Sequence, residues 1–173
     1  MNANPEQIIF RKAKESDIQN IWNILQQAIE RRKSDGSDQW QNGYPNLETI
    51  QNDLANSVGY VYEIKGKIAA YAAIIFDIEP AYEIIEGNWK SSGPYVVVHR
   101  VAVSADFAGK GIATQLFLEI ENLAKSQDYF VIKVDTNFDN LPMLKILEKL
   151  KYEYCGKVYF RGSERKAFEK ILK

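Results

Sequence analysis

The alternation of apolar and polar positions predicts a chain of mixed helices and strands. Apolar residues recur at helical spacing in four segments: about 16–33, 46–55, 112 onward and 140–150. Runs typical of strands occupy seven segments: 8–12, 60–64, 67–76, 95–103, 130–134, 152–160 and 166–172. The order is β-α-α-β-β-β-α-β-α-β-β, without an internal repeat or linker. Periodicity alone therefore predicts one α/β domain over residues 1–173.

Local signals sharpen several of these boundaries. Asn46 and Asn140 stand where asparagine is a favoured helix N-cap. The strand pairs are predicted to turn at Lys65-Gly66 and over residues 161–164. Segment 95–103 is almost continuously apolar, as expected of a strand buried on both faces. Residues 77–94 show neither period, so we expect a long irregular segment there.

Composition narrows the class of protein. The 173 residues carry 22 basic and 23 acidic side chains, a net charge of -1. This balance argues against a nucleic-acid binder with a basic face and against a polybasic membrane anchor. Cys155 is the single cysteine, so the chain has no internal disulfide and suits a reducing compartment. The first ten residues lack a secretory signal and no apolar run reaches 18 residues, so we expect a cytoplasmic protein.

A small-residue loop between an apolar strand and an amphipathic helix predicts an anion site. Residues 108–113 read Ala-Gly-Lys-Gly-Ile-Ala. Small residues let backbone N–H groups approach an anion, and the first N–H groups of a helix have no intrahelical partner. The spacing fits neither GxxxxGK[ST] nor GxGxxG. A phosphate or pyrophosphate cradle is predicted, with an ordinary glycine-rich turn as the alternative.

The same segment resembles the acyl-CoA-binding signature of the GNAT superfamily of N-acetyltransferases. That pattern, [Arg/Gln]-x-x-Gly-x-[Gly/Ala] after an apolar strand, is met by Val101-Ala102-Val103 and then by Gly111 and Ala113. Ala108 departs from it at the Arg/Gln position. The resemblance covers roughly residues 8–172 and implies a GNAT fold, a mixed central sheet of about seven strands with helices on both faces. It assigns to acyl-CoA binding Val101, Val103, Ala108, Gly109, Lys110, Gly111, Ile112, Ala113, Thr114 and Asn140.

The resemblance also bears on the leaving group of the reaction. In the family, an asparagine at the position of Asn140 binds CoA, and a tyrosine further along the helix protonates the thiolate. This chain has Leu147 at the tyrosine position. Tyr152 and Tyr154 are the substitutes that we consider, and water is the alternative proton donor.

His99, the sole histidine, is the first candidate for the general base. An unperturbed histidine accepts a proton near neutral pH. In the GNAT pattern its strand borders the thioester, and arylalkylamine N-acetyltransferases carry a histidine at a similar position. Glu79 is the alternative base. A histidine bonded to a carbonyl is the purely structural interpretation.

The irregular segment and its surroundings are rich in acids and aromatic side chains. An aromatic-walled acidic pocket would suit a cationic amine. The pocket residues that we predict are Trp40, Tyr44, Tyr82, Trp89 and Tyr95. Solvated loop acids and packing aromatics are the alternative for each. Arg100, a charge in an apolar strand, is predicted to form a structural ion pair.

These expectations combine into an enzyme that moves an acetyl group from acetyl-CoA to the amino group of a small molecule, by direct attack in a ternary complex. A protein or peptide N-acetyltransferase and a catalytically silent acyl-CoA-binding or regulatory module are the alternatives. With one histidine and one cysteine we expect no metal site. We expect no nucleic-acid or membrane partner, and the resemblance suggests a homodimer. The acceptor amine and the acyl-chain preference are not specified by the sequence.

Overall fold

Helices and strands alternate along residues 7–173, which are the residues that the computed structural model describes. They form two compact units. The first comprises the described chain up to Ala73 together with Arg100–Leu116, and the second comprises Ile74–His99 and Phe117–Lys173. The single domain over residues 1–173 stays a prediction.

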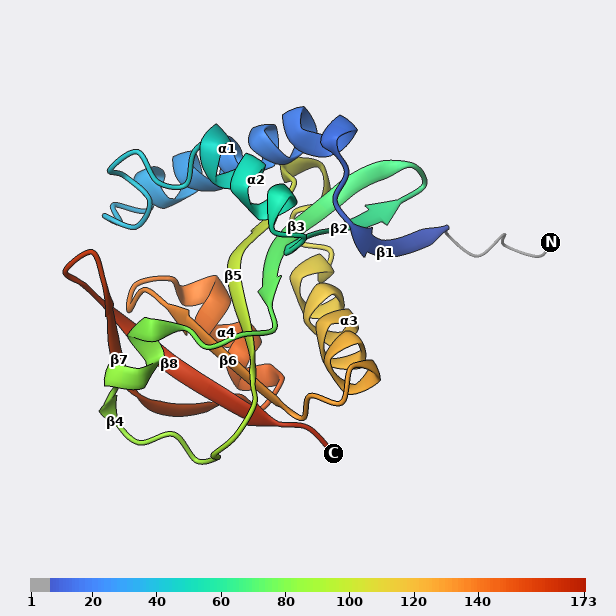
Figure 1. Ribbon diagram of the computed structural model, residues 1–173. Coiled ribbons are helices and arrows are strands. Elements are labelled where there is room, and N and C mark those ends of the chain that lie inside the picture. The colour runs from blue at the N-terminus through green and yellow to red at the C-terminus, as the bar shows by residue number, and fades with distance from the viewer. Residues whose placement is uncertain (1–6) are drawn as a thin grey trace. The chain divides into compact units, whose positions relative to one another are not determined.

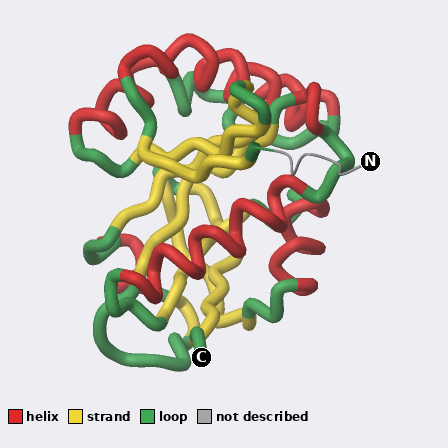
Figure 2. Tube along the Cα trace, turned by 90° about the vertical axis from the view of Figure 1, so that its right-hand side faces the viewer, coloured by secondary structure: helices red, strands yellow, loops and turns green. Residues whose placement is uncertain are grey.

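The first unit contains helices and antiparallel strands. Its elements are β1 (Ile8–Lys12), η1 (Glu15–Asp17), α1 (Ile18–Ser34), α2 (Leu47–Ala55), β2 (Gly59–Ile64), most of β3 (Lys67–Ile75) and η3 (Ala105–Phe107). β1 pairs with β2, and β2 pairs with β3, both antiparallel. Helices α1 and α2 contact each other (Figure 1). Figure 2, which keeps the vertical axis of Figure 1, shows them at the top, along one side of these strands.

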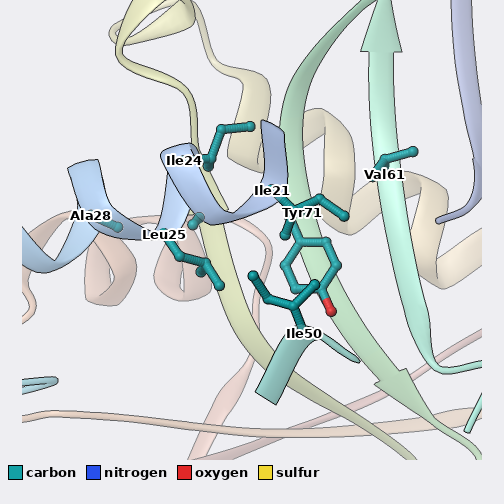
Figure 3. Packing of buried hydrophobic residues seen from close by; sticks show 8 residues of the cluster. Ile21, Ile24, Leu25, Ala28, Ile50, Val61 and Tyr71 are labelled. Atoms are coloured by element: carbon teal, nitrogen blue, oxygen red, sulfur yellow. The ribbon is translucent and has the colours of Figure 1, made fainter. Parts of the chain in front are cut away.

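The apolar stripe of α1 supplies the centre of the first core (Figure 3). The stripe repeats at intervals of three and four residues, which places its members on one helix face. The buried cluster consists of Ile21, Ile24, Leu25, Ala28, Ile50, Val61, Tyr71 and Ala102. Each buried Ile or Leu contributes about 1.5–3 kcal/mol to folding, so this cluster is a principal source of the unit's stability.

Two local predictions in this unit are confirmed. The side chain of Asn46 caps α2 by accepting the N–H of Thr49 at 3.0 Å. Lys65 and Gly66 form the β2–β3 turn with φ of 50° and 78°. Two successive residues with positive φ are typical of the tight hairpin turn whose twist matches the flanking strands.

The second unit contains both parallel and antiparallel strand pairs. Its elements are η2 (Pro80–Ile84), β4 (Glu86–Gly87), the start of β5 (Val96–Val103), β6 (Val131–Thr136), α4 (Leu141–Lys149), β7 (Glu153–Phe160) and β8 (Ser163–Ile171). β5 and β6 are parallel, whereas β6–β8, β7–β8 and β4–β7 are antiparallel. Figure 1 shows β7 and β8 as the red hairpin, with β4 beside β7. Helix α3 (Ile112–Ser126) continues from the first unit into this one.

The hydrogen-bonded strand order is β1-β2-β3-β5-β6-β8-β7-β4. A mixed sheet flanked by helices confirms the predicted α/β class. The described chain has eight strands where about seven were expected. The extra strand is β4, and it lies with η2 inside the segment that was predicted to be irregular. β4 is ordered by pairing with β7, which lies far along the chain, and a two-residue strand leaves no periodic signal in the sequence.

Two glycines make the short β4 strand possible. Gly87 and Gly156 face each other in the β4–β7 pair, with φ of 139° and 145°. A Cβ atom on Gly156 would lie 2.2 Å from the carbonyl oxygen of Glu86. Side chains are therefore excluded from this contact, and the two backbones approach directly.

Three other features of the backbone differ from the sequence prediction. β6 runs to Thr136, two residues beyond the predicted end. The β7–β8 turn consists of Arg161 and Gly162, with φ of 50° and 74°, instead of residues 161–164. Arg100 has φ of 55° within β5, so the strand is not uniformly extended at this residue.

Aromatic residues dominate the core of the second unit. Its buried members are Tyr82, Tyr95, Val97, Val131, Val158 and Ala167, against which Trp89 and Phe160 pack. Tyr82 is 1% exposed. The β4–β5 region is thus anchored by its aromatic side chains. Across residues 7–173, no helix is both long enough and apolar enough to cross a membrane.

Candidate active site

The predicted cradle lies in the first unit, between η3 and α3. Gly109 and Gly111 have φ of 73° and 72°, in the left-handed region that favours glycine. An added Cβ on either residue would meet no atom within 4 Å. The backbone of this loop is therefore accessible to a ligand.

The N-terminus of α3 adds donors to this loop. The carbonyl of Gly111 accepts the N–H of Gln115 at 3.2 Å, which closes the first helical turn. The N–H groups of Ile112, Ala113 and Thr114 thus precede the first intrahelical donor. The Lys110 ammonium lies 5.5 Å from the ring centroid of Phe107. These groups fit a pyrophosphate, since they combine free N–H groups, the positive end of a helix dipole and a cation.

The remaining residues assigned to acyl-CoA lie on three elements. Val101 and Val103 are half-buried in β5, and the Val103 carbonyl accepts a hydrogen bond from Arg31 at 2.8 Å. Ala108 follows η3 with φ of -60°. In the second unit, the side chain of Asn140 caps α4 by accepting the N–H of Met143 at 3.3 Å. Asn140 therefore has a structural role in addition to its predicted one.

The two tyrosines that could replace the missing general acid, Tyr152 and Tyr154, differ in their exposure to solvent. Leu147 is fully buried. The Tyr152 hydroxyl is buried and donates to Glu121 at 3.4 Å, and burial raises the pKa of Tyr152 well above its usual value. Tyr154 is 51% exposed. Of these three, only Tyr154 has a side chain that is accessible to solvent.

The two candidate bases contact each other in the second unit. Nε2 of His99 lies 3.0 Å from Oε2 of Glu79, and their side chains are 15% and 19% exposed. The other oxygen of Glu79 accepts the N–H of Ala81 at 3.3 Å at the start of η2. Both groups therefore have a defined orientation and still reach the surface. This is the arrangement required of groups that exchange a proton.

Asp135, which the sequence prediction missed, approaches the other nitrogen of His99. Nδ1 of His99 lies 3.6 Å from Oδ1 of Asp135. The hydroxyl of Tyr82 donates to this same oxygen at 2.5 Å. The predicted strand ended at Val134, directly before Asp135, whereas β6 runs to Thr136. An acid directly after a buried apolar run was the signal that would have revealed it.

Burial governs the protonation of this cluster. It raises the pKa of Asp135, and the nearby positive groups, His99 foremost, partly oppose this rise. Burial also raises the pKa of Tyr82 well above its usual value, with Asp135 adding to the shift. Tyr82 is therefore a permanent hydrogen-bond donor near neutral pH. The ring edges of Tyr82 and Phe160 enclose the imidazole, with centroids 6.1 and 5.6 Å from that of His99.

The other aromatic residues of the predicted pocket form one group in the second unit. Tyr95 donates its hydroxyl to Glu83 at 3.0 Å and accepts the N–H of Glu79 at 3.1 Å. Trp89 donates its indole N–H to the carbonyl of Tyr82 at 2.8 Å.

The same aromatic residues also bind a cation that belongs to the protein. The ammonium of Lys133 lies 4.3 Å from the ring centroid of Trp89 and 3.9 Å from that of Tyr95. Burial lowers the pKa of Lys133. An internal cation thus uses one face of each ring, and both residues have a structural role beside the predicted one.

Trp40 and Tyr44 lie in the first unit. Trp40 packs against the first core. The hydroxyl of Tyr44 accepts a hydrogen bond from Arg100 at 2.7 Å. Arg100 also pairs with Asp53, which confirms the predicted structural ion pair. Among residues 7–173, no cluster of three His, Cys, Asp or Glu side chains is placed to hold a metal ion.

Comparisons with known proteins agree with this fold. Residues 19–152 match the model of the acetyltransferase (GNAT) family. The chain belongs to this family and is by class an N-acetyltransferase.

Individual relatives extend the match to almost the whole chain. The uncharacterized N-acetyltransferase YesJ of Bacillus subtilis (strain 168) is 26% identical over 144 residues, covering 81% of this chain and 78% of YesJ. A GNAT-family acetyltransferase structure from Streptococcus agalactiae 2603 is 36% identical, with a TM-score of 0.88 and 96% of each chain covered. The ribosomal-protein-alanine N-acetyltransferase of Brucella melitensis shares the fold, with 20% identity, a TM-score of 0.69 and coverage of 95% and 99%.

Proposed function

We propose that this enzyme transfers the acetyl group of acetyl-CoA to the amino group of a small molecule, by direct attack with both substrates bound. The contact between Glu79 and His99 carries the proposal. Amine acetylation must dispose of one proton per turnover, and these two groups form a partly exposed acid–base pair in a GNAT-family chain.

The donor would be held by the loop and helix terminus of the first unit. The N–H groups of residues 109–114 and the Lys110 ammonium would bind the pyrophosphate. The assignment of Asn140 to the donor stays a prediction from the resemblance. Acetyl-CoA supplies the thioester carbonyl carbon at which the new C–N bond forms as the C–S bond breaks. The open, positive-φ backbone at Gly109 and Gly111 supports this assignment.

Glu79 and His99 would remove the proton of the acceptor. A primary amine resembles lysine, whose pKa near 10.4 leaves it protonated and unreactive at neutral pH. The partly exposed Glu79 carboxylate would accept the proton, and His99, at 3.0 Å, would share it. Because the two groups are in direct contact, we treat the dyad as the base rather than either residue alone.

The leaving thiolate needs little help from the protein. A thiol with a pKa near 8.5 leaves readily and takes its proton from water. Leu147 is buried and has no proton to donate. We therefore assign no general acid, with Tyr154 as the residue to test first.

Acidic groups support a cationic small amine as the acceptor. Asp77, Glu83 and Glu86 are exposed carboxylates in the segment that carries Glu79. Negative charge attracts an alkylammonium substrate and does nothing for a neutral one. A peptide acceptor stays an alternative, and a homodimer and the cytoplasmic location stay predictions.

A thermal-shift titration tests the donor first. Acetyl-CoA should raise the melting temperature, and dephospho-CoA and ATP should do so less, because a ligand that binds only the folded state stabilises it by mass action. Thiol release is then measured with small diamines, with aromatic amines and with short peptides. Release with small amines supports the proposal, and release with peptides alone overturns the acceptor class. A thermal shift without any thiol release would identify a protein that binds acyl-CoA but does not catalyse transfer. The absence of a thermal shift would show that acetyl-CoA is not the donor.

A further inference from the structure

The geometry points to Asp135 as a positioning residue for His99. We propose that Asp135, held in place by Tyr82, fixes the orientation of the imidazole and stabilises the positive charge that the ring gains when the dyad accepts a proton. The inference rests on the proposed function in one respect, namely that Glu79 and His99 receive the proton of the acceptor amine.

The imidazole of His99 lies between two carboxylates. Glu79 approaches Nε2 at 3.0 Å, and Asp135 approaches Nδ1 at 3.6 Å. Tyr82 and Phe160 meet the ring edge-on at 60° and 87°, which opposes rotation of the imidazole away from these oxygens. A proton on either nitrogen therefore has an acidic neighbour. An imidazolium interacts favourably with both sides at once, which no neutral tautomer does.

The two carboxylates differ in their access to solvent. Glu79 is 19% exposed, and Asp135 has only 9% of its side chain exposed. Glu79 is therefore the group that can meet a substrate, whereas Asp135 acts through the ring. This division resembles that of a serine-protease triad, in which a buried aspartate orients the histidine and stabilises its imidazolium without being protonated itself.

Asp135 needs Tyr82 in order to stay charged. A buried carboxylate without hydrogen bonds is costly, and it becomes protonated instead. The Tyr82 hydroxyl donates at 2.5 Å and favours the charged form, as do the positive charges of His99 and of Arg165 on β8. Glu79 opposes it. Phe160 on β7 also faces the ring but carries no charge. The groups that set the balance between the charged and neutral forms of Asp135 are therefore Tyr82, His99, Arg165 and Glu79.

The single histidine makes the test direct, because the ring of His99 gives the only imidazole signals in a nitrogen-15 NMR spectrum. Wild type is compared with Asp135→Asn, and Glu148→Gln on the exposed face of α4 serves as the control. Removing the negative charge destabilises the imidazolium, so the ring should lose its second proton at lower pH in Asp135→Asn than in wild type. Glu148→Gln should match wild type.

Activity gives a second readout. In Asp135→Asn, kcat should fall about tenfold or more, and the acid limb of kcat/KM should move to lower pH with the ring. The KM for acetyl-CoA should stay unchanged. A merely structural role would lower the melting temperature without moving the pH profile.

The reciprocal measurement keeps the proposal testable where Asp135→Asn does not fold. In His99→Gln, and again in Tyr82→Phe, the carboxyl carbon-13 signal of Asp135 should titrate at higher pH than in wild type, since each variant loses a contact that favours the charged form. An unchanged ring titration in folded Asp135→Asn, or an unchanged carboxyl titration in His99→Gln, would overturn the inference. Failure of the proposed function would give a different result. Wild type would release no thiol, while the titration changes expected above for His99 and Asp135 would still be observed.

Discussion

Arg100 binds Asp53 through two nitrogens, with Nε at 2.9 Å and Nη2 at 2.5 Å from the carboxylate oxygens. Its third nitrogen donates to the hydroxyl of Tyr44 at 2.7 Å. The Asp53 carboxylate also accepts the hydroxyl of Tyr71 at 2.6 Å. These bonds hold Arg100 at φ of 55°, a conformation that a non-glycine residue rarely adopts. The residue after His99 is thus fixed by a network of the first unit.

Replacing Asp53 with Asn should lower the free energy of unfolding by about 3–5 kcal/mol, because the substitution leaves a buried guanidinium without its counter-ion. Chemical denaturation measures this loss. Asp128→Asn, at an exposed position, should stay within about 0.5 kcal/mol of wild type. Equal stability of the two variants would contradict the assignment.

The Asp17 carboxylate predicts a pH-dependent part of the stability. Burial opposes its ionisation, but Arg11, at 2.7 Å, and the N–H of Lys14 outweigh burial and lower the pKa of Asp17. A group whose folded pKa lies below the unfolded value stabilises the fold above about pH 4 and loses this effect as the pH falls. The melting temperature of Asp17→Asn should therefore lie below that of wild type at neutral pH, and the gap should shrink in acid. A gap that is independent of pH would argue against the ion pair.

Glu79→Gln and His99→Gln should each lower kcat by about 10²–10⁴-fold, since each disables one half of the proton-accepting dyad. Affinity for acetyl-CoA, measured by calorimetry, should be retained in both variants. The double variant should lose little more than either single one, because the two groups act as a unit. Additive losses would show that the residues act separately.

Gly111 allows a test of the anion cradle by charge alone. Asn and Asp have the same shape and both tolerate positive φ. Gly111→Asp should bind acetyl-CoA at least about tenfold more weakly than Gly111→Asn, because the carboxylate would repel a pyrophosphate. The difference should narrow at high salt, where charges are screened. Equal affinities of the two variants would show that the pyrophosphate does not bind at this loop.

Gly156→Ala should disrupt the pairing of β4 with β7. A Cβ there would lie 2.2 Å from the Glu86 carbonyl, so the backbones would have to separate. Gly36→Ala is the matched control, since it has φ of 76° with open space around it. Backbone strain should lower the free energy of unfolding of the control by only about 1–3 kcal/mol, and Gly156→Ala should lose more. Hydrogen exchange of the Asn88 amide, which donates to the Cys155 carbonyl at 3.0 Å, would report the separation.

The sequence anticipated the regular elements well. The helix stripes, the Asn46 and Asn140 caps and the Lys65-Gly66 turn follow from interactions within a few residues, and all are present. It missed β4, because a two-residue strand has no period, and it placed the β7–β8 turn over four residues instead of two. It also ended β6 before Asp135, since a charged residue breaks an apolar run although the strand continues.

The sequence by itself determined the class of fold, the glycine loop before α3 and the single histidine, because each depends on local spacing or on a residue type that occurs once. Only the tertiary structure decided which side chains meet. His99 lies 20 residues from Glu79 and 36 from Asp135 in sequence, yet the packing of η2, β5 and β6 brings all three together. Trp89 and Tyr95 likewise bind Lys133 from a different strand. Such contacts depend on burial and on strand register across the sheet, which no single segment encodes.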